Sequence, residues 1–498
     1  MTLSTFLRLS EWDSLRLGSA FLLLAGFANT VCFGQGTQPL VPGTVVTGQC
    51  QGHTGWPGCV LPNLFGPTGL TVFANPVVPH YAHFIGAAQT TLNETLSSAI
   101  ATQLAILPII SPSSGFTYKY DSEAGAFVRT TTSFGPIYAE RAETVGRGKF
   151  SFGTSYQRFR FSSIDGIDLH KVPAVFGHLP DTGPGGVPEP YEADVIQTSN
   201  NINLNIDSTM LYGTVGVTDR VDVSVSIPIV SVRMGVTSDA TIVRVSGPSF
   251  TIPGGQTFPN PHQFTSDPNS LTHSYLSNGN ASGLGDASFR VKTAVWRGRN
   301  AGLSLGMDVR TPTGNARELL GSGAIGLKPF VAVSATGRHF SPHVNLGYQW
   351  NGRSILAGDI TGTVVSEDAS GAAVISNVPA VKQSLPSQLF YTIGADFGAG
   401  KGMTFAFDYL GQTLINTPRV FRDISPTQNI PGGTGTLWLP TISAGKDTVA
   451  LSSASTGVKY NLFGNLLLTA NLLFRLDNKG LRQDVIPLVA LSYAFGGK

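Results

Sequence analysis

The chain has 498 residues, enough for two or three ordinary domains or for one large β-barrel. Charged residues make up only 12% of it, roughly half of the about 25% typical of a soluble globular protein. Glycine and proline are abundant, at 59 and 31 residues. Lysine plus arginine total 32 against 30 aspartate plus glutamate, so there is no basic excess to hold a nucleic acid and no acidic tail. The composition therefore argues against nucleic acid as a partner and indicates a turn-rich chain of low charge.

The first 34 residues have the pattern of an export signal. Arg16 precedes an apolar run over residues 17–28, and a stretch of small residues places the best cleavage point after Gly34. A short buried helix is the alternative, because a membrane-spanning helix needs about 20 apolar residues. The rest of the sequence has no apolar run of that length. If the exported chain lies in a membrane, it has to cross as strands.

Residues 35–145 differ from the remainder of the chain. Cys50 and Cys59 are the two thiols left after cleavage, and an oxidising compartment favours a disulfide that closes a loop between them. Residues 82–107 have helical spacing until Pro108 ends it. We expect residues 35–145 to be a periplasmic segment or a plug inside a barrel.

From residue 146 to the C-terminus, segments of ten or more residues alternate apolar and polar side chains, the period of a strand with two different faces. In 342–351, one face carries Val344, Leu346, Tyr348 and Trp350, and the other carries His343, Asn345, Gly347 and Gln349. In the same way, Ile202, Leu204 and Ile206 alternate with Asn201, Asn203 and Asn205. We expect about twelve strands, near residues 148–162, 200–217, 220–235, 283–297, 301–313, 323–338, 341–352, 386–398, 401–415, 447–461, 465–477 and 484–496.

The connections between these segments alternate between long and short. The longest are 163–199, 236–282, 353–385 and 416–446. Short turns at one end and long loops at the other are typical of outer-membrane barrels, in which an even number of strands returns both termini to the periplasm. Strands can span hydrocarbon only as a closed barrel with an apolar outside, because unpaired backbone groups are too costly there.

The sequence therefore predicts an all-β protein, a closed antiparallel transmembrane β-barrel over residues 146–498, in the bacterial outer membrane. Outer-membrane lipid should contact the apolar side, and the barrel-assembly machinery should be a partner during insertion. Residues 116–132 resemble a hairpin, which would raise the strand count to fourteen if it joined the wall. Three prolines, Pro228, Pro329 and Pro487, should each mark a bulge or a strand end. A shift in the apolar alternation within 148–162 predicts another bulge.

Charged side chains on the polar face of the strands should point into the lumen, because a Lys or Arg in contact with lipid at mid-membrane costs about 2–4 kcal/mol. These expected lumen-facing residues are Arg290, Lys292, Asp308, Arg310, Lys328, Asp396, Asp408, Lys459 and Arg475. They could set the selectivity of a pore or form a structural lattice of paired charges. Both signs occur, which argues against a strongly ion-selective pore.

Several runs resemble one protein family. They are YGTVGVTDRVDVSVSIP at 212–228, SGLGDASFRVKTAVW at 282–296, GLSLGMDVRTPTG at 302–314 and HVNLGYQW at 343–350. They look like the outer-membrane barrel family named for a meta-pathway of phenol degradation, over roughly residues 200–498. These motifs are strand and turn residues without chemistry of their own. The resemblance implies a barrel that passes small organic compounds, aromatic or apolar.

Four motifs could indicate chemistry, but their context disfavours it. Ser304 lies in a G-x-S-x-G run that alternates as a strand, whereas a nucleophile elbow needs a turn between strand and helix. Residues 321–326 match G-x-G-x-x-G, yet a strand follows where phosphate binding needs a helix. His339 and His343 have Pro342 between them, and His80 and His83 stand without further ligands, so we expect no metal.

We conclude from the sequence that the protein is not an enzyme and needs no cofactor. Its expected function is passive passage of small organic solutes across the outer membrane. A barrel of about twelve to fourteen strands lies between sealed small barrels and open large ones, so we expect a narrow or gated pore. The alternative is a surface adhesin or structural anchor with a sealed lumen, whose function lies in the long loops.

Overall fold

The computed structural model describes most of the chain from residue 50 onward, in one compact unit, Thr47–Lys498. The described residues are 50, 53–66, 69–74, 84, 87–88, 90–105, 118–121, 126–129, 133–177, 190–251, 255–337, 339–358, 363–367, 373–377, 381–399, 402–426 and 437–495. The predicted signal and the pair His80 and His83 lie outside them.

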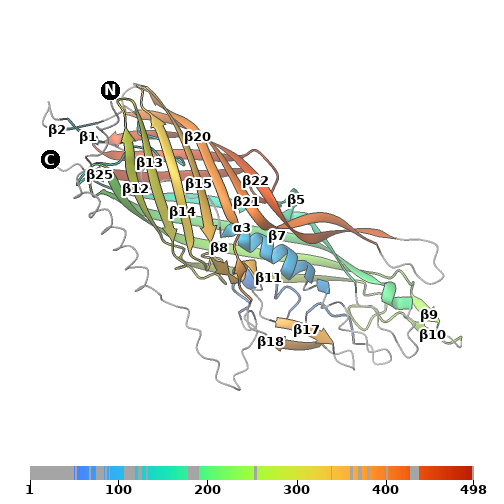
Figure 1. Cartoon of the computed structure of the whole chain (residues 1–498). Helices are drawn as coiled ribbons and strands as arrows, with labels where there is room; N and C mark the ends of the chain where they lie inside the picture. The colour runs from blue at the N-terminus through green and yellow to red at the C-terminus, as the bar shows by residue number, and fades with distance from the viewer. Residues whose placement is uncertain are drawn as a thin grey trace, which may run out of the picture. The chain divides into compact units, whose positions relative to one another are not determined.

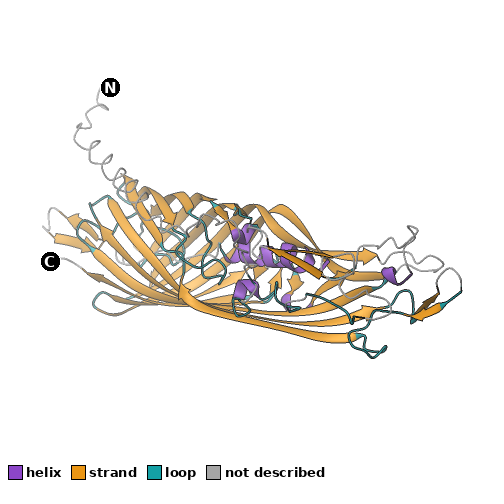
Figure 2. Cartoon of the chain, turned by 90° about the horizontal axis from the view of Figure 1, so that it is seen from below, coloured by secondary structure: helices purple, strands orange, loops and turns teal. Residues whose placement is uncertain are grey.

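Twelve antiparallel strands close into a barrel (Figures 1 and 2). Each pairs with the next in the ring, and the last pairs with the first. In ring order they are β3 (Phe150–Phe161), β7 (Val195–Gly216), β8 (Val221–Val243), β12 (Ser288–Arg297), β13 (Ala301–Arg310), β14 (Gly326–Ala335), β15 (Phe340–Asn351), β20 (Ser387–Ala399), β21 (Met403–Pro426), β22 (Trp438–Phe463), β23 (Leu466–Arg475) and β25 (Val485–Phe495). The predicted closed barrel of twelve strands is confirmed.

The predicted hairpin at 116–132 does not raise this number. Its strands β1 (Tyr118–Asp121) and β2 (Ala126–Arg129) pair with each other as a separate sheet of two strands. The hairpin forms as the sequence predicts, but a count of fourteen for the barrel ring is wrong.

Two further strands extend the wall on one side of the barrel. β6 (Val172–Phe176) pairs with the outer part of β7, beyond the end of β3, and β11 (Thr272–Leu284) pairs with the outer part of β8, beyond the end of β12. The segments 163–199 and 236–282, predicted as loops, therefore contain wall strands. β7 and β8 have 22 and 23 residues, about twice the 9–11 that cross a bilayer. In Figure 1, β7 and β8 accordingly run well past the ends of β12 to β15.

The remaining elements are short. The small strands are β4 (Ser163–Ile164), β5 (Ile167–Asp168), β9 (Ser249–Thr251), β10 (Thr257–Pro259), β16 (Arg353–Ser354), β17 (Thr363–Glu367), β18 (Ala373–Asn377), β19 (Gln383–Ser384) and β24 (Leu481–Arg482). The helical turns are η1 (Pro57–Cys59), η2 (Thr90–Ser97), α3 (Ser98–Leu104), η3 (Leu169–Lys171), η4 (Pro190–Ala193) and η5 (Ile355–Ala357). Among the described helices, none combines the length and apolarity required to cross a bilayer.

The two ends of the barrel differ as the sequence predicts. Short turns such as 217–220 and 298–300 lie at one end, together with the start of β3 and the end of β25. The long connections lie at the other end. By the rule for outer-membrane barrels, the short turns mark the periplasmic end. We call the opposite end the outer end.

An apolar belt covers the outside of the strands near the periplasmic end. Outward side chains here are Val344, Leu346, Tyr348 and Trp350 on β15, Phe405, Phe407 and Tyr409 on β21, and Val489, Leu491, Tyr493 and Phe495 on β25. All are at least 36% exposed, so the belt is the surface that lipid would cover. A closed barrel with this belt is an outer-membrane protein.

The polarity of the two faces reverses along β7 and β8. The outward face of β8 carries Val223, Val225, Ile227 and Ile229, and then Ser231, Arg233, Thr237, Asp239 and Thr241. Its inward face carries Asp222, Ser224 and Ser226, and then Val232, Met234 and Val236. The β7–β8 register is unbroken over this length, so no bulge causes the reversal. On β7, Ile202, Leu204 and Ile206 are buried inside, so the expectation that they face lipid is wrong.

The expected irregularities are also corrected. β3 pairs with β7 without a register shift, so the predicted bulge within 148–162 is absent; Phe159 and Phe161 instead point inward. Pro228 lies within β8 at the point where its neighbour changes from β12 to β11, and its missing N–H interrupts no ladder there. Pro329 lies where the β14–β15 pairing lapses, and Pro487 precedes the β25–β3 pairing.

Candidate functional site

The periplasmic half of the lumen holds residues 133–149, which have no regular secondary structure until β3 begins. Backbone groups without such structure need other partners when they are buried. Side chains of the wall supply them. The amides of Phe134, Tyr138, Glu140, Ala142 and Val145 donate to Thr404, Asp408, Asn345, Ser334 and Asp222, respectively. Lys459 donates to the carbonyls of Phe134 and Pro136, and Lys292 donates to those of Arg141 and Glu143.

Ion pairs fix this segment further. Arg141 contacts Asp396 at 3.0 Å, and both side chains are almost completely buried. His343 lies against Asp408, with 2.7 Å between the ring nitrogen Nε2 and the carboxylate oxygen. The Tyr138 hydroxyl accepts from the Gln157 amide at 2.8 Å, and burial raises the pKa of the Tyr138 phenol above its usual range. We call residues 133–149 the polar plug segment.

The outer half of the lumen holds residues 53–105, with gaps in the described part. Hydrogen bonds join this segment to the wall and its loops, including Gly58 N to Arg317 O at 3.1 Å and Asn280 N to Gly55 O at 3.0 Å. The structure contains a Cys50–Cys59 disulfide. An apolar core forms between the segment and the inner wall, with Val60, Leu64, Leu70, Leu92, Leu96 and Ile100 on one side and Ile202, Leu204, Ile206, Val232, Met234 and Val236 on the other. We call residues 53–105 the apolar plug segment.

A cavity of about 220 Å³ lies in the barrel at the level of the strands' middle residues. Tyr138 and Glu140 of the polar plug segment line it, together with side chains from β3, β8, β12 to β15 and β20 to β25. A smaller cavity of about 110 Å³ lies against Ala101, Leu104 and Ala105 of the apolar plug segment. Phe159 and Arg310 line both cavities, so the two are neighbours.

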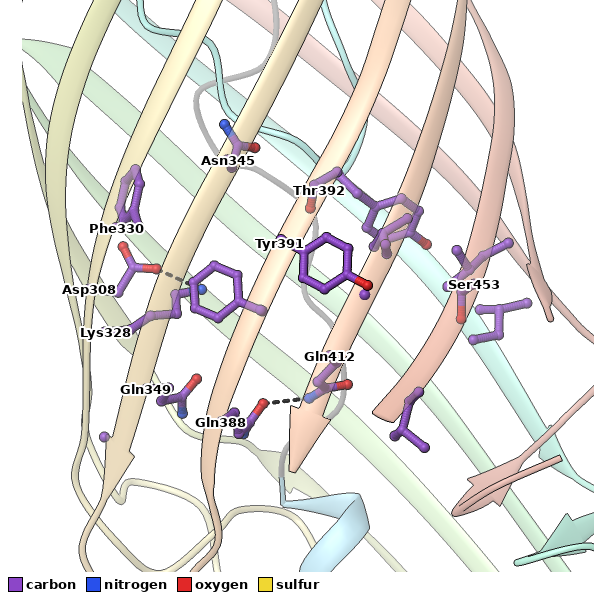
Figure 3. A pocket seen from close by; sticks show the side chains of 18 of the residues that line it. Asp308, Lys328, Phe330, Asn345, Gln349, Gln388, Tyr391, Thr392, Gln412 and Ser453 are labelled. Carbon is purple, nitrogen blue, oxygen red and sulfur yellow. Dashed lines mark hydrogen bonds and ion pairs between the residues drawn. The ribbon is translucent and has the colours of Figure 1, made fainter. Parts of the chain in front are cut away.

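One wall of the larger cavity carries aromatic rings and charges in adjacent rows (Figure 3). Phe330 lies over Gly306, and Phe390 lies over Gly347; a Cβ at either glycine would collide with the ring. Arg290 stands over the Phe330 ring at 5.0 Å, and the Lys328 ammonium stands over the Phe390 ring at 4.7 Å. Asp308 lies between the two cations, 2.7 Å from Arg290 Nη2 and 3.0 Å from Lys328 Nζ.

The nine charged residues named from the sequence divide into two groups. Arg290, Asp308, Arg310, Lys328 and Arg475 line the larger cavity. Lys292, Asp396, Asp408 and Lys459 instead contact the polar plug segment or side chains that hold it. The structure therefore brings the first group together around an open space, whereas the second group binds backbone and side-chain groups of the polar plug segment.

Sequence reasoning missed the aromatic lining. Phe159, Phe161, Phe330 and Phe390 all lie on the inner face and line the cavity. The available signal was their position: each occurs on the otherwise polar face of its strand, where an aromatic residue needs a partner inside the barrel.

Two sequence motifs resemble a nucleophile elbow and a phosphate-binding loop, but neither has the geometry that such a site needs. Ser304 is fully buried within β13, with Ala294 and Ala332 as its cross-strand neighbours, and not in a turn between strand and helix. Residues 321–326 lead directly into β14, so no helix follows the glycines. His343 belongs to the carboxylate cluster of Asp396 and Asp408, and His339 is exposed.

The sequence profile of the family described as "Putative MetA-pathway of phenol degradation" matches residues 187–380. Over these residues the chain is similar to that family. The resemblance noted in the sequence is thereby confirmed for that part of the chain. No curated protein matches the chain.

Solved structures with a similar chain trace include an outer membrane channel and two toluene transporters. An outer membrane channel from Pseudomonas putida F1 is 11% identical, with a TM-score of 0.39, over 72% of this chain and 99% of that one. The toluene transporter TbuX of Ralstonia pickettii is 14% identical, with a TM-score of 0.31, over 77% of this chain and 99% of that one. The toluene transporter TodX of P. putida is 8% identical, with a TM-score of 0.29, over 71% of this chain and 91% of that one.

Proposed function

We propose that the protein is a channel for passive passage of small organic solutes across the outer membrane, and that it catalyses no reaction. The observation that carries this proposal is the cavity of about 220 Å³ within the barrel, bounded by both charged and aromatic side chains. A barrel that served only as an anchor would gain stability by filling this space. The match to the phenol-degradation family over residues 187–380 supports a role with small organic compounds.

We further propose that residues 35–145 act in this channel as a plug. The plug continues through residues 146–149 to the start of β3. The two plug segments differ in what binds them. Burial of apolar surface holds the apolar plug segment, whereas the polar plug segment is bound through hydrogen bonds and ion pairs that water can replace. The polar plug segment is therefore the part that yields when a solute passes.

Efflux from proteoliposomes tests this function. Benzenesulfonate and benzyltrimethylammonium are ring compounds of opposite charge that cross lipid slowly. We expect both to leave proteoliposomes faster than protein-free liposomes. Arg141→Met should raise the rate about tenfold, because it removes the buried ion pair with Asp396 and loosens the polar plug segment.

The matched control is Arg299→Met, which removes an exposed arginine from a periplasmic turn and should leave the rate unchanged. If neither ring compound leaves faster than from empty liposomes, even with Arg141→Met, the lumen is sealed. The protein would then be the adhesin or anchor of the alternative prediction.

A further inference from the structure

The cations that line the larger cavity differ in how they are neutralised. Arg310 donates to Ala105 O and Asn351 Oδ1, at 2.8 and 2.9 Å. Arg475 contacts Asp484 at 2.7 Å and Ser163 at 3.0 Å. Each of these guanidinium groups is held on two sides by protein oxygens, and each has a carboxylate nearby, Asp286 at 3.7 Å from Arg310 and Asp484 at 2.7 Å from Arg475.

Lys328 differs from these arginines. It ends a row of alternating charges that runs from Glu140 through Arg290 and Asp308. Its ammonium has one carboxylate neighbour among the described residues, Asp308, and its side chain is 28% exposed, the largest fraction in this row. An ammonium has three N–H donors, so Lys328 has donors beyond the one that Asp308 takes.

Amide side chains continue the row beyond Lys328. Leu327 lies opposite Trp350 and Phe330 opposite Gly347, which places Lys328 opposite Gln349, and Gln349 lies opposite Gln388. The Gln349 amide donates to Asn351 at 2.9 Å. The Gln388 oxygen accepts from Gln412, as Figure 3 shows. Its Nε2 group is buried and has no partner among the described residues.

A buried donor without a partner is destabilising, and a bound acceptor would relieve that cost. The Gln388 oxygen accepts a hydrogen bond from Gln412, so the N–H₂ group of the same amide is available to donate to a bound acceptor. Lys328 and Gln388 thus form a corner of the cavity with hydrogen-bond donors and a positive charge.

The opposite side of the cavity has an apolar part, beside the polar side chains of Arg475, Arg482 and Gln483. Phe159 and Phe161 of β3, Leu473 of β23 and Ile486 of β25 line it. The volume of about 220 Å³ has room for one ring, since an apolar cavity of about 150 Å³ holds benzene. The cavity is therefore amphipathic, with an apolar wall for a ring and a cationic corner for an oxyanion.

We propose that this cavity binds a single-ring organic anion, with the ring against Phe159 and Phe161 and the oxyanion at Lys328 and Gln388. This inference rests on the proposed channel function and adds its solute class. Lys328 is the most exposed charge of the row, so it is the cation of that row that a bound anion can contact.

Calorimetric titration of the purified protein in detergent tests this class. Benzenesulfonate should bind, whereas methanesulfonate, which lacks the ring, and benzyltrimethylammonium, which lacks the anion, should bind at least about tenfold more weakly. Lys328→Met should weaken benzenesulfonate binding about tenfold, because it removes a charged hydrogen-bond donor. Lys328→Arg keeps the charge and should retain most of the binding.

Arg299→Met is the matched control, since it removes the same charge from an exposed periplasmic turn that does not line the cavity. It should leave benzenesulfonate binding within about twofold of the original. Equal loss in both variants would mean that only the net charge matters, and no loss in Lys328→Met would remove Lys328 from the site; either result overturns the inference. If either of these binding results were found while both ring compounds still left proteoliposomes at equal rates, only this inference would be refuted. The proposed channel function would still hold.

Discussion

The periplasmic and outer halves of β8 have the same alternating pattern with opposite polarity. Near the periplasmic end, Val223 and Ile227 face outward and Asp222 and Ser226 face inward. Beyond Ile229, polar side chains face outward and apolar ones inward. β8 is thus one continuous strand in one register with β7. Its periplasmic half lies between lipid and a polar lumen, and its outer half lies between water and an apolar core.

Alternation therefore indicates that a strand has two unlike surroundings, but it does not indicate which of the two is lipid. In the membrane, the outside has to be apolar, so polar groups collect in the lumen and bind the polar plug segment. Above the membrane, the outside faces water, and the apolar plug segment needs apolar side chains to pack against. The reversal between Ile229 and Ser231 therefore marks the outer limit of the lipid belt.

The largest expected effect comes from the apolar core of the outer half. Val236 is 1% exposed and belongs to that core. Val236→Arg should lower the free energy of unfolding by about 5 kcal/mol, because it places an unpaired charge and extra volume in a packed site. Urea titration of the barrel in lipid vesicles measures this. Thr237→Arg, the next residue on the outward face, should change it by less than about 0.5 kcal/mol, and equal losses would contradict the reversed polarity.

A smaller effect is expected on the outward face in the membrane. Val225 lies between Val223 and Ile227 on this face. Val225→Arg should cost about 2–4 kcal/mol in the same titration, because it directs a charge into lipid. Thr237→Arg again serves as the control, with the same substitution on the same face of the same strand. A Val225→Arg protein as stable as the control would show that the lipid belt does not reach this position.

Much of the fold could be predicted from the sequence, because each barrel strand has two unlike faces over ten or more residues. The position of the ends of β7 and β8 could not be predicted, since their outer halves owe their pattern to the apolar plug segment. Phe159 and Phe161 were interpreted as a bulge for the same reason: an apolar residue on the inner face needs a partner that the strand's own sequence does not reveal.

The candidate site was predictable in part. The strands' polar faces pointed to Asp308 and Lys328, and the structure places both at the cavity. The sequence did not reveal that Phe330 and Phe390 lie over Gly306 and Gly347, because that packing depends on cross-strand neighbours. It also did not distinguish the charges that line the cavity from Lys292 and Lys459, which bind the plug backbone.

The most direct test is a profile of surroundings along the outward face of β8. Spin labels placed singly at residues 223, 227, 229, 237 and 241, in protein reconstituted into bilayers, report collision with oxygen, which concentrates in lipid, or with a water-soluble nickel complex. Oxygen should dominate up to Ile229 and the nickel complex at Thr237 and Thr241. Contact with lipid at all five positions, or with water at all five, would contradict the account.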